Sequence, residues 1–282
     1  MIRKLIIVFI LIIFAAASFL VINKPKHRLR QEDSGSSGQE IDPGAVQPAN
    51  KLFDLAKRYE AENEFALSRE TYQKILRLHP DYPQIQEAQK HLEDVNLKII
   101  FSPTLITAES QYYEVKPGDT LSKIAKKFDT TVELIKKINM LKSDLIRPGM
   151  NLKIWKGKFS ALVDKSLNIL MLKSNEAIVK TYIVATGKNN STPVGTFKII
   201  NKLVDPVWFK PQVGAMVPAD SPENILGSRW MGFDAAGYGI HGTTEPEALG
   251  SQVTQGCVRM KNEDVEELFS FLPQGTEVTI ID

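Results

Sequence analysis

The sequence of 282 residues has a single cysteine, Cys257, and only four histidines. One cysteine excludes any disulfide within the chain, and an unpaired thiol outside the cytoplasm is open to oxidation. A structural zinc ion needs about four Cys, His or carboxylate ligands. Because Cys257 and His241 are the only Cys and His after residue 157, we expect no metal site in this part of the chain.

An excess of charge of either sign is also missing. Lys and Arg number 35 against 33 Asp and Glu. Basic and aromatic residues are not interleaved as they are in proteins that bind single-stranded nucleic acid. The sequence therefore predicts no nucleic-acid partner.

A long apolar run is present at the N-terminus. Residues 5–22, LIIVFILIIFAAASFLVI, contain no charge and are long enough for a helix that crosses a bilayer. We therefore predict a membrane anchor in residues 1–22, with a cleaved signal peptide or a buried core helix as alternatives. Basic residues within 24–30 outnumber those at 3–4, a pattern that would keep the bulk of the chain cytoplasmic.

Two segments without obvious catalytic character follow. Residues 23–48 are rich in Ser, Gly, Pro and charge, which predicts a flexible linker. Apolar residues return at helical spacing in 49–97, and this segment resembles one tetratricopeptide unit with a capping helix, through Leu52, Leu55, Ala56, Tyr59, Ser68, Tyr72 and Pro80. We predict a tetratricopeptide-like helical hairpin that either binds a protein partner or acts as a spacer. A second linker, 98–111, comes next.

Residues 112–155 show the pattern of a strand, two helices and a closing strand. Tyr113 begins an alternating strand, and Thr130 with Glu133 predicts a capping box for the second helix. The stretches PGDTLSKIA and IRPGMNLKI closely resemble a LysM module, whose family binds N-acetylglucosamine in glycan strands such as peptidoglycan. A small α/β insert without a ligand is the alternative.

Residues 156–282 alternate with a period of two and are rich in β-branched residues, which is typical of strands. We expect strands at 159–164, 169–172, 177–185, 195–200, 230–233, 238–241 and 277–281. One helix is expected near residue 262, with Asn262 at its N-cap. The pattern predicts a mostly-β domain, a sandwich or distorted barrel with one packed helix.

Cys257 and His241 together indicate nucleophilic chemistry in this domain. A free thiol is only a few per cent thiolate at neutral pH, so a nucleophilic cysteine needs a base, and His241 is the one histidine available. Gly256 permits a tight turn that points backbone amides at an oxyanion. On spacing alone, a buried cysteine without chemistry remains the alternative.

The segment HGTTEPEALGSQVTQGCVRM, residues 241–260, closely resembles the active-site signature of the L,D-transpeptidase family, the YkuD-type catalytic domain. In that family an HGT turn is followed by Ser or Thr, a variable residue, Gly-Cys, an aliphatic residue and Arg or Asn. STPVGTFKI, residues 191–199, also resembles the family's upstream TPxGxF segment. The resemblance extends from about residue 158 to 282.

The resemblance implies catalytic roles for individual residues. Cys257 is the expected nucleophile, His241 its general base, and the carbonyl of Gly242 the group that orients His241. The amides of Gly256 and Cys257 are expected to form the oxyanion hole. Arg259 is expected to order the loop and meet a substrate carboxylate, with a structural ion pair as the alternative.

Three further residues are expected to contact the substrate. Tyr238 stands where members of the family carry an aromatic residue beside the site, although it is equally consistent with an ordinary strand residue. Thr254 and Gln255 precede the Gly-Cys pair. Many members have a second histidine at the position of Gln255, and Gln cannot accept a proton at neutral pH.

The resemblance implies acyl transfer in peptidoglycan stem peptides, without a metal or cofactor. The thiolate attacks the third residue of a donor tetrapeptide, the terminal D-alanine leaves, and an amine of another stem resolves the thioester into a 3→3 cross-link. Resolution by water would give an L,D-carboxypeptidase, and attachment of a protein to the wall is a third outcome. A non-catalytic wall-binding scaffold is the rival from another class.

The sequence thus predicts a multidomain chain: a transmembrane helix, tetratricopeptide-like helices, a βααβ LysM module and a mostly-β YkuD-like catalytic domain. Glycan is the expected partner of the LysM module, and stem peptides are the expected partner of the catalytic domain. Because both domains require peptidoglycan, we expect residues 23–282 outside the cytoplasmic membrane of a bacterial envelope, with residues 5–22 as the anchor.

Overall fold

The computed structural model describes residues 43–106, 108–210 and 214–282. The predicted membrane helix, residues 5–22, lies outside these ranges, as does most of the first predicted linker. Among the described residues, no helix is both long and apolar enough to cross a membrane. The chain divides into two compact units, with the boundary between Asn96 and Leu97.

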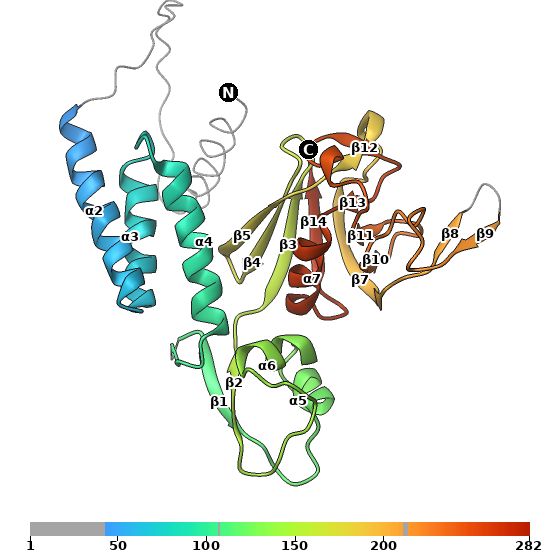
Figure 1. Cartoon of the computed structure of the whole chain (residues 1–282), viewed down its shortest axis with the longest axis horizontal. Helices are drawn as coiled ribbons and strands as arrows, with labels where there is room; N and C mark the ends of the chain where they lie inside the picture. The colour runs from blue at the N-terminus through green and yellow to red at the C-terminus, as the bar shows by residue number, and fades with distance from the viewer. Residues whose placement is uncertain (1–42, 107, 211–213) are drawn as a thin grey trace, which may run out of the picture. The chain divides into compact units, whose positions relative to one another are not determined.

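The first unit is helical. It contains α2 (Pro43–Ala61), α3 (Phe65–Leu78) and most of α4 (Ile85–Phe101) (Figure 1). Phe53 of α2 packs against Tyr72 and Tyr82, with ring centroids 6.0 and 5.9 Å apart. Helix α2 begins inside the predicted linker, because proline is well tolerated at the first helical position, where its missing N–H is not needed. Kinship with tetratricopeptide repeats stays a prediction.

Residues 110–155 form the predicted strand-helix-helix-strand module. Strands β1 (Ser110–Glu114) and β2 (Asn151–Trp155) pair in antiparallel fashion around α5 (Leu121–Lys127) and α6 (Val132–Ile138). The N-cap of α6 is Thr131, whose hydroxyl accepts a hydrogen bond from the Leu134 amide at 2.9 Å. The predicted capping box at Thr130 is therefore wrong by one residue.

The C-terminal region is built on one sheet of eight strands, in the order β13-β11-β10-β7-β14-β3-β4-β5. The strands are β3 (Phe159–Asp164), β4 (Ile169–Ser174), β5 (Ala177–Ile183), β7 (Gly195–Val204), β10 (Arg229–Phe233), β11 (Gly239–His241), β13 (Val258–Arg259) and β14 (Glu277–Ile281). Every strand predicted from the sequence is present. Ala185, which continues from β5, forms a bridge with Arg259 of β13, so the two ends of the sheet approach each other as in a distorted barrel.

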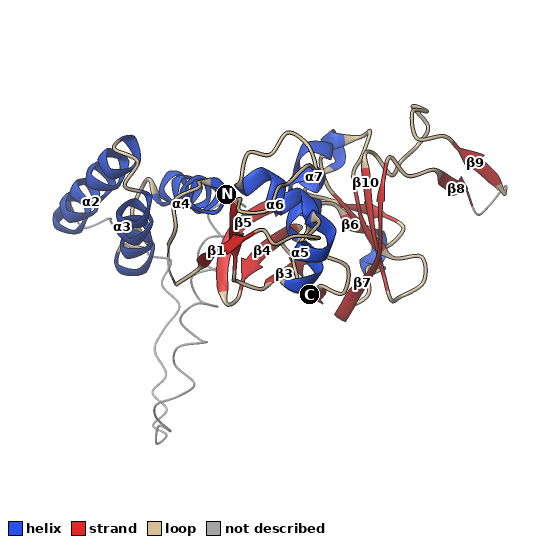
Figure 2. Cartoon of the chain, turned by 90° about the horizontal axis from the view of Figure 1, so that it is seen from below, coloured by secondary structure: helices blue, strands red, loops and turns tan. Residues whose placement is uncertain are grey.

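Several short elements were not predicted. Strands β6 (Thr186–Gly187) and β12 (Gln252–Thr254) pair in parallel, and β8 (Trp208–Lys210) pairs with β9 (Ala215–Val217). Two 3-10 turns are η1 (Lys188–Asn190) and η2 (Pro246–Ala248). The β8–β9 hairpin extends away from the main sheet in both Figure 1 and Figure 2.

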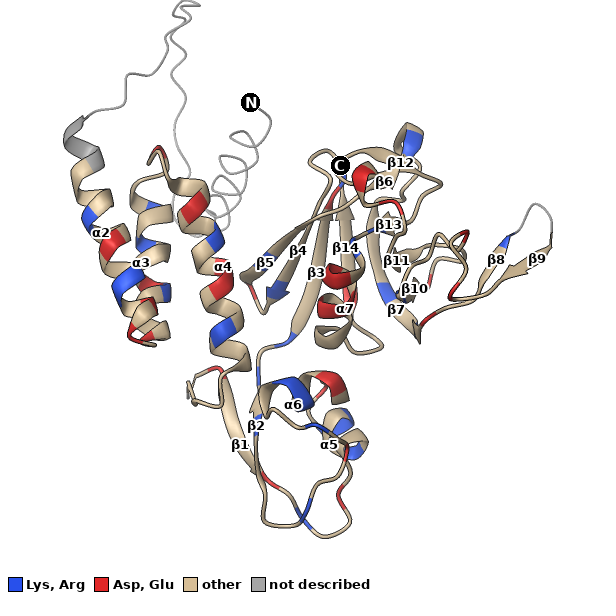
Figure 3. Cartoon of the chain, viewed as in Figure 1, with Lys and Arg blue, Asp and Glu red and all other residues tan. Residues whose placement is uncertain are grey.

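Helix α7 (Asn262–Phe271) packs on the sheet at β10 and β11. It carries four acidic residues and no basic one (Figure 3), with Glu263 and Asp264 in the first turn, where the helix dipole favours negative charge. At the other end, Nζ of Lys202 donates hydrogen bonds of 2.7 Å to the carbonyl oxygens of Phe269 and Leu272. Both ends of α7 are thus electrostatically satisfied.

The end of α7 also contacts the βααβ module. The Thr131 hydroxyl donates to the carbonyl oxygen of Ser270, and Nζ of Lys137 donates to the Ser270 hydroxyl at 3.1 Å. Phe271 packs between Phe101 and Phe159, at centroid distances of 5.5 and 5.0 Å. Helices α6 and α7 accordingly lie side by side in Figures 1 and 2.

Candidate active site

Strands β11 and β13 bring the predicted base and nucleophile to one face of the sheet. They pair in parallel, with His241 opposite Arg259. Cys257 directly precedes β13, so this register places it beside Gly239. Because alternate residues of a strand point to the same face, Cys257 lies diagonally across from His241.

A hydrogen-bonded turn at Thr254 fixes the backbone next to the thiol. The Thr254 hydroxyl accepts a hydrogen bond from the Gly256 amide at 3.1 Å and donates one to the carbonyl oxygen of Cys257 at 2.7 Å. Thr254 is buried, so its side chain serves this turn, which differs from the substrate contact that the sequence predicts. The Gly256 amide, one of two predicted oxyanion donors, is already engaged here.

Gly256 is enclosed by two segments. Its φ of +134° is a conformation that L-residues rarely adopt, and a Cβ there would lie 2.5 Å from Cε1 of Tyr238 and 3.3 Å from the carbonyl oxygen of Ser191. Tyr238 borders the turn on one side, and the segment around Ser191 borders it on the other side. That segment is held by Lys165, whose Nζ donates to the Thr192 carbonyl at 2.8 Å.

His241 is 3% exposed, and its Nδ1 lies 2.7 Å from the carbonyl oxygen of Gly242. Burial is the main cause that lowers the pKa of His241 to about 4; the charge of Arg259 lowers it further, and backbone hydrogen bonds at Gly242 and Ile225 oppose the shift. At neutral pH the imidazole is uncharged. With Nδ1–H donated to the carbonyl, Nε2 holds the lone pair that can accept a proton.

The Cys257 thiol is also neutral at rest. Burial raises its pKa, while a hydrogen bond from the Gly239 backbone and the charge of Arg259 lower it in part. Sγ donates to the carbonyl oxygen of Gly237 at 3.5 Å. A neutral thiol and a neutral imidazole suit general-base catalysis, in which the proton moves as the sulfur attacks.

Asn262 ties the loop after His241 to α7. Its Oδ1 accepts hydrogen bonds from the amides of Ser228 and Thr243, each at 3.1 Å. A Cβ at Gly242 would lie 2.2 Å from this oxygen, so a larger residue there would displace the Asn262 side chain from its two hydrogen bonds. The predicted N-cap role of Asn262 is wrong, because the helix begins at Asn262 itself and the side chain serves neighbouring loops.

Arg259 is paired within the protein. Its Nη1 donates to Oε2 of Glu245 at 2.8 Å. Arg259 is 8% exposed, and its Nε is buried without a partner among the described residues. This geometry favours the structural ion pair over direct contact with a substrate carboxylate. Gln255, by contrast, is exposed next to the turn.

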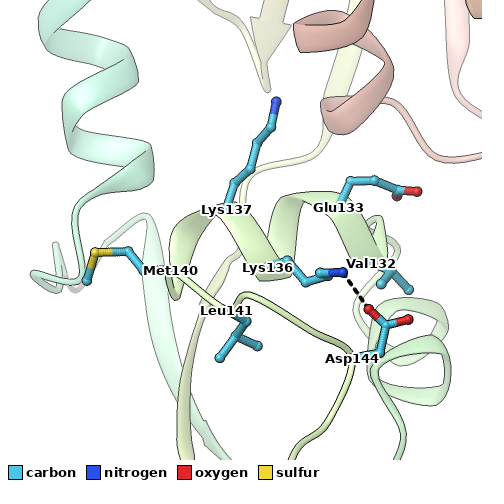
Figure 4. Close-up of a pocket in the computed structure, with 7 residues that line it drawn as sticks. All are labelled: Val132, Glu133, Lys136, Lys137, Met140, Leu141 and Asp144. Carbon is cyan, nitrogen blue, oxygen red and sulfur yellow. Dashed lines mark hydrogen bonds and ion pairs between the residues drawn. The ribbon is translucent and has the colours of Figure 1, made fainter.

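A separate cavity of about 440 Å³ lies on α6 and the loop after it (Figure 4). Its lining combines an apolar part with a charged rim, on which Nζ of Lys136 contacts Oδ1 of Asp144 at 2.6 Å. The lining residues are Val132, Glu133, Lys136, Lys137, Met140, Leu141 and Asp144. None of the predicted catalytic residues belongs to this cavity.

No cluster of three or more His, Cys, Asp or Glu side chains within the described part of the chain is arranged to hold a metal ion. The groups that are brought together at β11 and β13 are a thiol, an imidazole, a guanidinium and backbone amides. They suit transfer of an acyl group through a covalent thioester.

Two family models match the chain. Residues 158–280 match the L,D-transpeptidase catalytic domain (YkuD), and residues 113–155 match the LysM domain. The helical segment 49–97 lies outside both.

The chain is similar to two Bacillus subtilis proteins whose names place them among the L,D-transpeptidases. YqjB is 41% identical over 127 residues, which cover 43% of this chain and 70% of YqjB. YkuD is 33% identical over 175 residues, which cover 60% of this chain and 97% of YkuD. An L,D-transpeptidase structure from Mycobacterium smegmatis aligns at a TM-score of 0.39 and 16% identity, over 48% of this chain and 64% of that one, slightly less than two thirds of its length.

Proposed function

Because the chain belongs to the L,D-transpeptidase family, we propose that it transfers acyl groups between peptidoglycan stem peptides through a thioester on Cys257. The observation that carries this proposal is the parallel pairing of β11 with β13, which puts His241 and Cys257 on one face of the sheet. The product we propose is a 3→3 cross-link.

In the first half of the reaction, Nε2 of His241 takes the proton of the Cys257 thiol while the sulfur attacks the carbonyl of the third residue of the donor stem. The amide of Cys257, which has no acceptor among the described residues, donates to the oxyanion. The Gly256 amide is held by Thr254, so we assign the oxyanion to Cys257. The intermediate collapses to a thioester, and the departing D-alanine takes the proton from His241.

In the second half, the amine of an acceptor stem attacks the thioester, and His241 removes a proton from the attacking nitrogen. The amide bond forms, and the sulfur leaves as the thiol after it regains that proton. Water in place of the amine would complete a carboxypeptidase reaction by the same steps.

Mass spectrometry of muropeptides from purified peptidoglycan incubated with the full chain tests this proposal. New 3→3 dimers in the wild type, absent with Cys257→Ser and His241→Asn, are expected. Loss of D-alanine without dimers would indicate an L,D-carboxypeptidase. A protein linked covalently to the peptidoglycan would indicate that the enzyme attaches proteins to the wall. An unchanged digest, with wall binding retained, would assign a scaffold and overturn the proposal.

We propose that the LysM domain holds the enzyme on glycan and that the catalytic region lies outside the cytoplasmic membrane, anchored through residues 5–22. A reporter active only in the cytoplasm, fused after Asp282, is expected to stay inactive. Activity of that fusion would contradict the proposed orientation.

A further inference from the structure

The indole of Trp230 lies against the imidazole of His241. Trp230 on β10 is the antiparallel partner of His241 on β11. The two ring centroids are 6.0 Å apart, and the ring planes differ by 24°. The hydrogen bond from Nδ1 to Gly242 fixes one atom of the imidazole, whereas a stacked neighbour fixes the plane of the ring.

The indole is itself held from several sides. Its Nε1 donates to Oδ1 of Asn201 at 2.9 Å, and the same oxygen accepts from the Gly232 amide at 3.1 Å. A Cβ at Gly232 would lie 2.8 Å from Nε1, and a Cβ at Gly239 would lie 3.0 Å from the indole carbons Cζ2 and Cη2. The ring therefore occupies space that two glycines leave open, across β10 and β11.

We propose that Trp230 is a positioning residue, which sets the plane of the His241 imidazole and keeps water from one of its faces. The inference rests on the proposed function, in which His241 is the base. Trp230 acts through His241 and takes no part in proton or acyl transfer itself.

The charged and titratable groups that face His241 are Arg259 on β13 and the thiol of Cys257 before it. From β10 it meets the uncharged indole, and from the segment before β10 the backbone of Ile225. Burial is the largest influence on the imidazole, and the indole supplies part of that burial. Removing the indole admits water, which favours the protonated form of His241.

The test is an NMR titration of the His241 ring in the full chain, together with the rate at which iodoacetamide alkylates Cys257. In Trp230→Ala the pKa of His241 should rise by at least one unit. Alkylation at pH 7 should nevertheless slow by about tenfold, because a ring that is free to rotate no longer directs Nε2 at the thiol, and this loss opposes the gain in basicity. Trp230→Phe should restore most of both values, since a ring remains. The control Trp208→Ala, which removes an indole from the β8–β9 hairpin, should change neither.

A Trp230→Ala protein that melts at the wild-type temperature with unchanged pKa and alkylation rate would overturn the proposal. If Trp230→Ala does not fold, Asn201→Leu takes its place, because it removes the acceptor of the indole N–H and leaves both rings; the same shifts at smaller size are expected, and unchanged values would again overturn it. Failure of the proposed function is separable, since absence of cross-links in the wild type leaves the NMR result unaffected.

Discussion

The hydroxyl of Thr254 donates a 2.7 Å hydrogen bond to the carbonyl oxygen of Cys257. The same hydroxyl accepts a hydrogen bond from the amide of Gly256, so one side chain closes the turn that carries the thiol. Sequence comparison with the family motif places Ser or Thr at this position without saying why. The geometry supplies a reason, because the hydroxyl oxygen of a short side chain can accept one hydrogen bond and donate another from the same atom.

We expect Thr254→Val to lower kcat/KM by about 10²-fold, since a displaced nucleophile loses near-attack geometry. Thr254→Ser should keep activity within a few-fold, because the hydroxyl remains. Turnover of a soluble donor tetrapeptide measures both. Equal activity of the Val and Ser variants would contradict the role of the hydroxyl.

His241 should make stability depend on pH. Its pKa is about 4 in the folded protein and about 6.5 in an unfolded chain, so between these values the unfolded chain binds a proton that the folded protein excludes. The free energy of unfolding should therefore increase from pH 4 to 6.5, by up to about 3 kcal/mol, and this contribution is lost as the pH falls. Urea denaturation of the wild type and of His241→Asn at several pH values isolates the contribution of His241, because the contributions of other titratable groups cancel in the difference. The same dependence of the free energy of unfolding on pH in both proteins would contradict this prediction.

The ion pair between Arg259 and Glu245 distinguishes two roles for the arginine. Glu245→Gln should cost about 1 kcal/mol of stability, because the glutamate side chain is 55% exposed while the arginine side chain is 10% exposed. It should change kcat/KM by the same factor for donors with free and with amidated carboxylates. If Arg259→Gln lowered kcat/KM only for the donor with a free carboxylate, direct contact of Arg259 with the substrate would be the better interpretation.

The side chain of Phe271, at the end of α7, is fully buried between Phe101 of α4 and Phe159 of β3. Phe271→Ala should cost about 3–5 kcal/mol through lost contacts with Phe101 and Phe159. Phe209→Ala, at a position 56% exposed on the hairpin, is the matched control and should cost less than about 0.5 kcal/mol. Chemical denaturation measures both, and similar costs would show that the buried contact contributes nothing.

The cavity on α6 is the concave feature that we expect glycan to occupy. Met140 lines it and Leu145 does not, yet both are 70% exposed on the same domain. Met140→Asp should weaken sedimentation with insoluble peptidoglycan by placing a carboxylate in the apolar part, whereas Leu145→Asp should not. The reverse order would move the glycan site to the Leu145 loop.

The elements with strong local patterns were the ones that the sequence predicted. The alternation of apolar and polar residues predicted both ends of β3 and β14 correctly, because one face of each strand is buried. The hairpin of β8 and β9 was missed because three-residue strands are too short to show a period. Strand β13 has only two residues, so it can be recognised as a strand only from its pairing with β11.

The site was predicted as far as its motif reached. Cys257 and His241 stand out by residue type, and the role of the Gly242 carbonyl was implied by the resemblance to the family. Trp230 looks like any strand aromatic, since its contact with His241 exists only once β10 and β11 have paired. Asn262 misled in a similar way, because an amide before an apolar helix signals a cap, and the loops that use it instead are distant in sequence.

Strand β14 lies between β7 and β3 and pairs with both, so Glu277–Ile281 fills the gap between these two strands. Translation makes these residues after all seven other strands. Until they emerge, β3 and β7 each present an open edge that can pair with another chain. A nascent copy is therefore most prone to aggregation just before its joining strand leaves the ribosome.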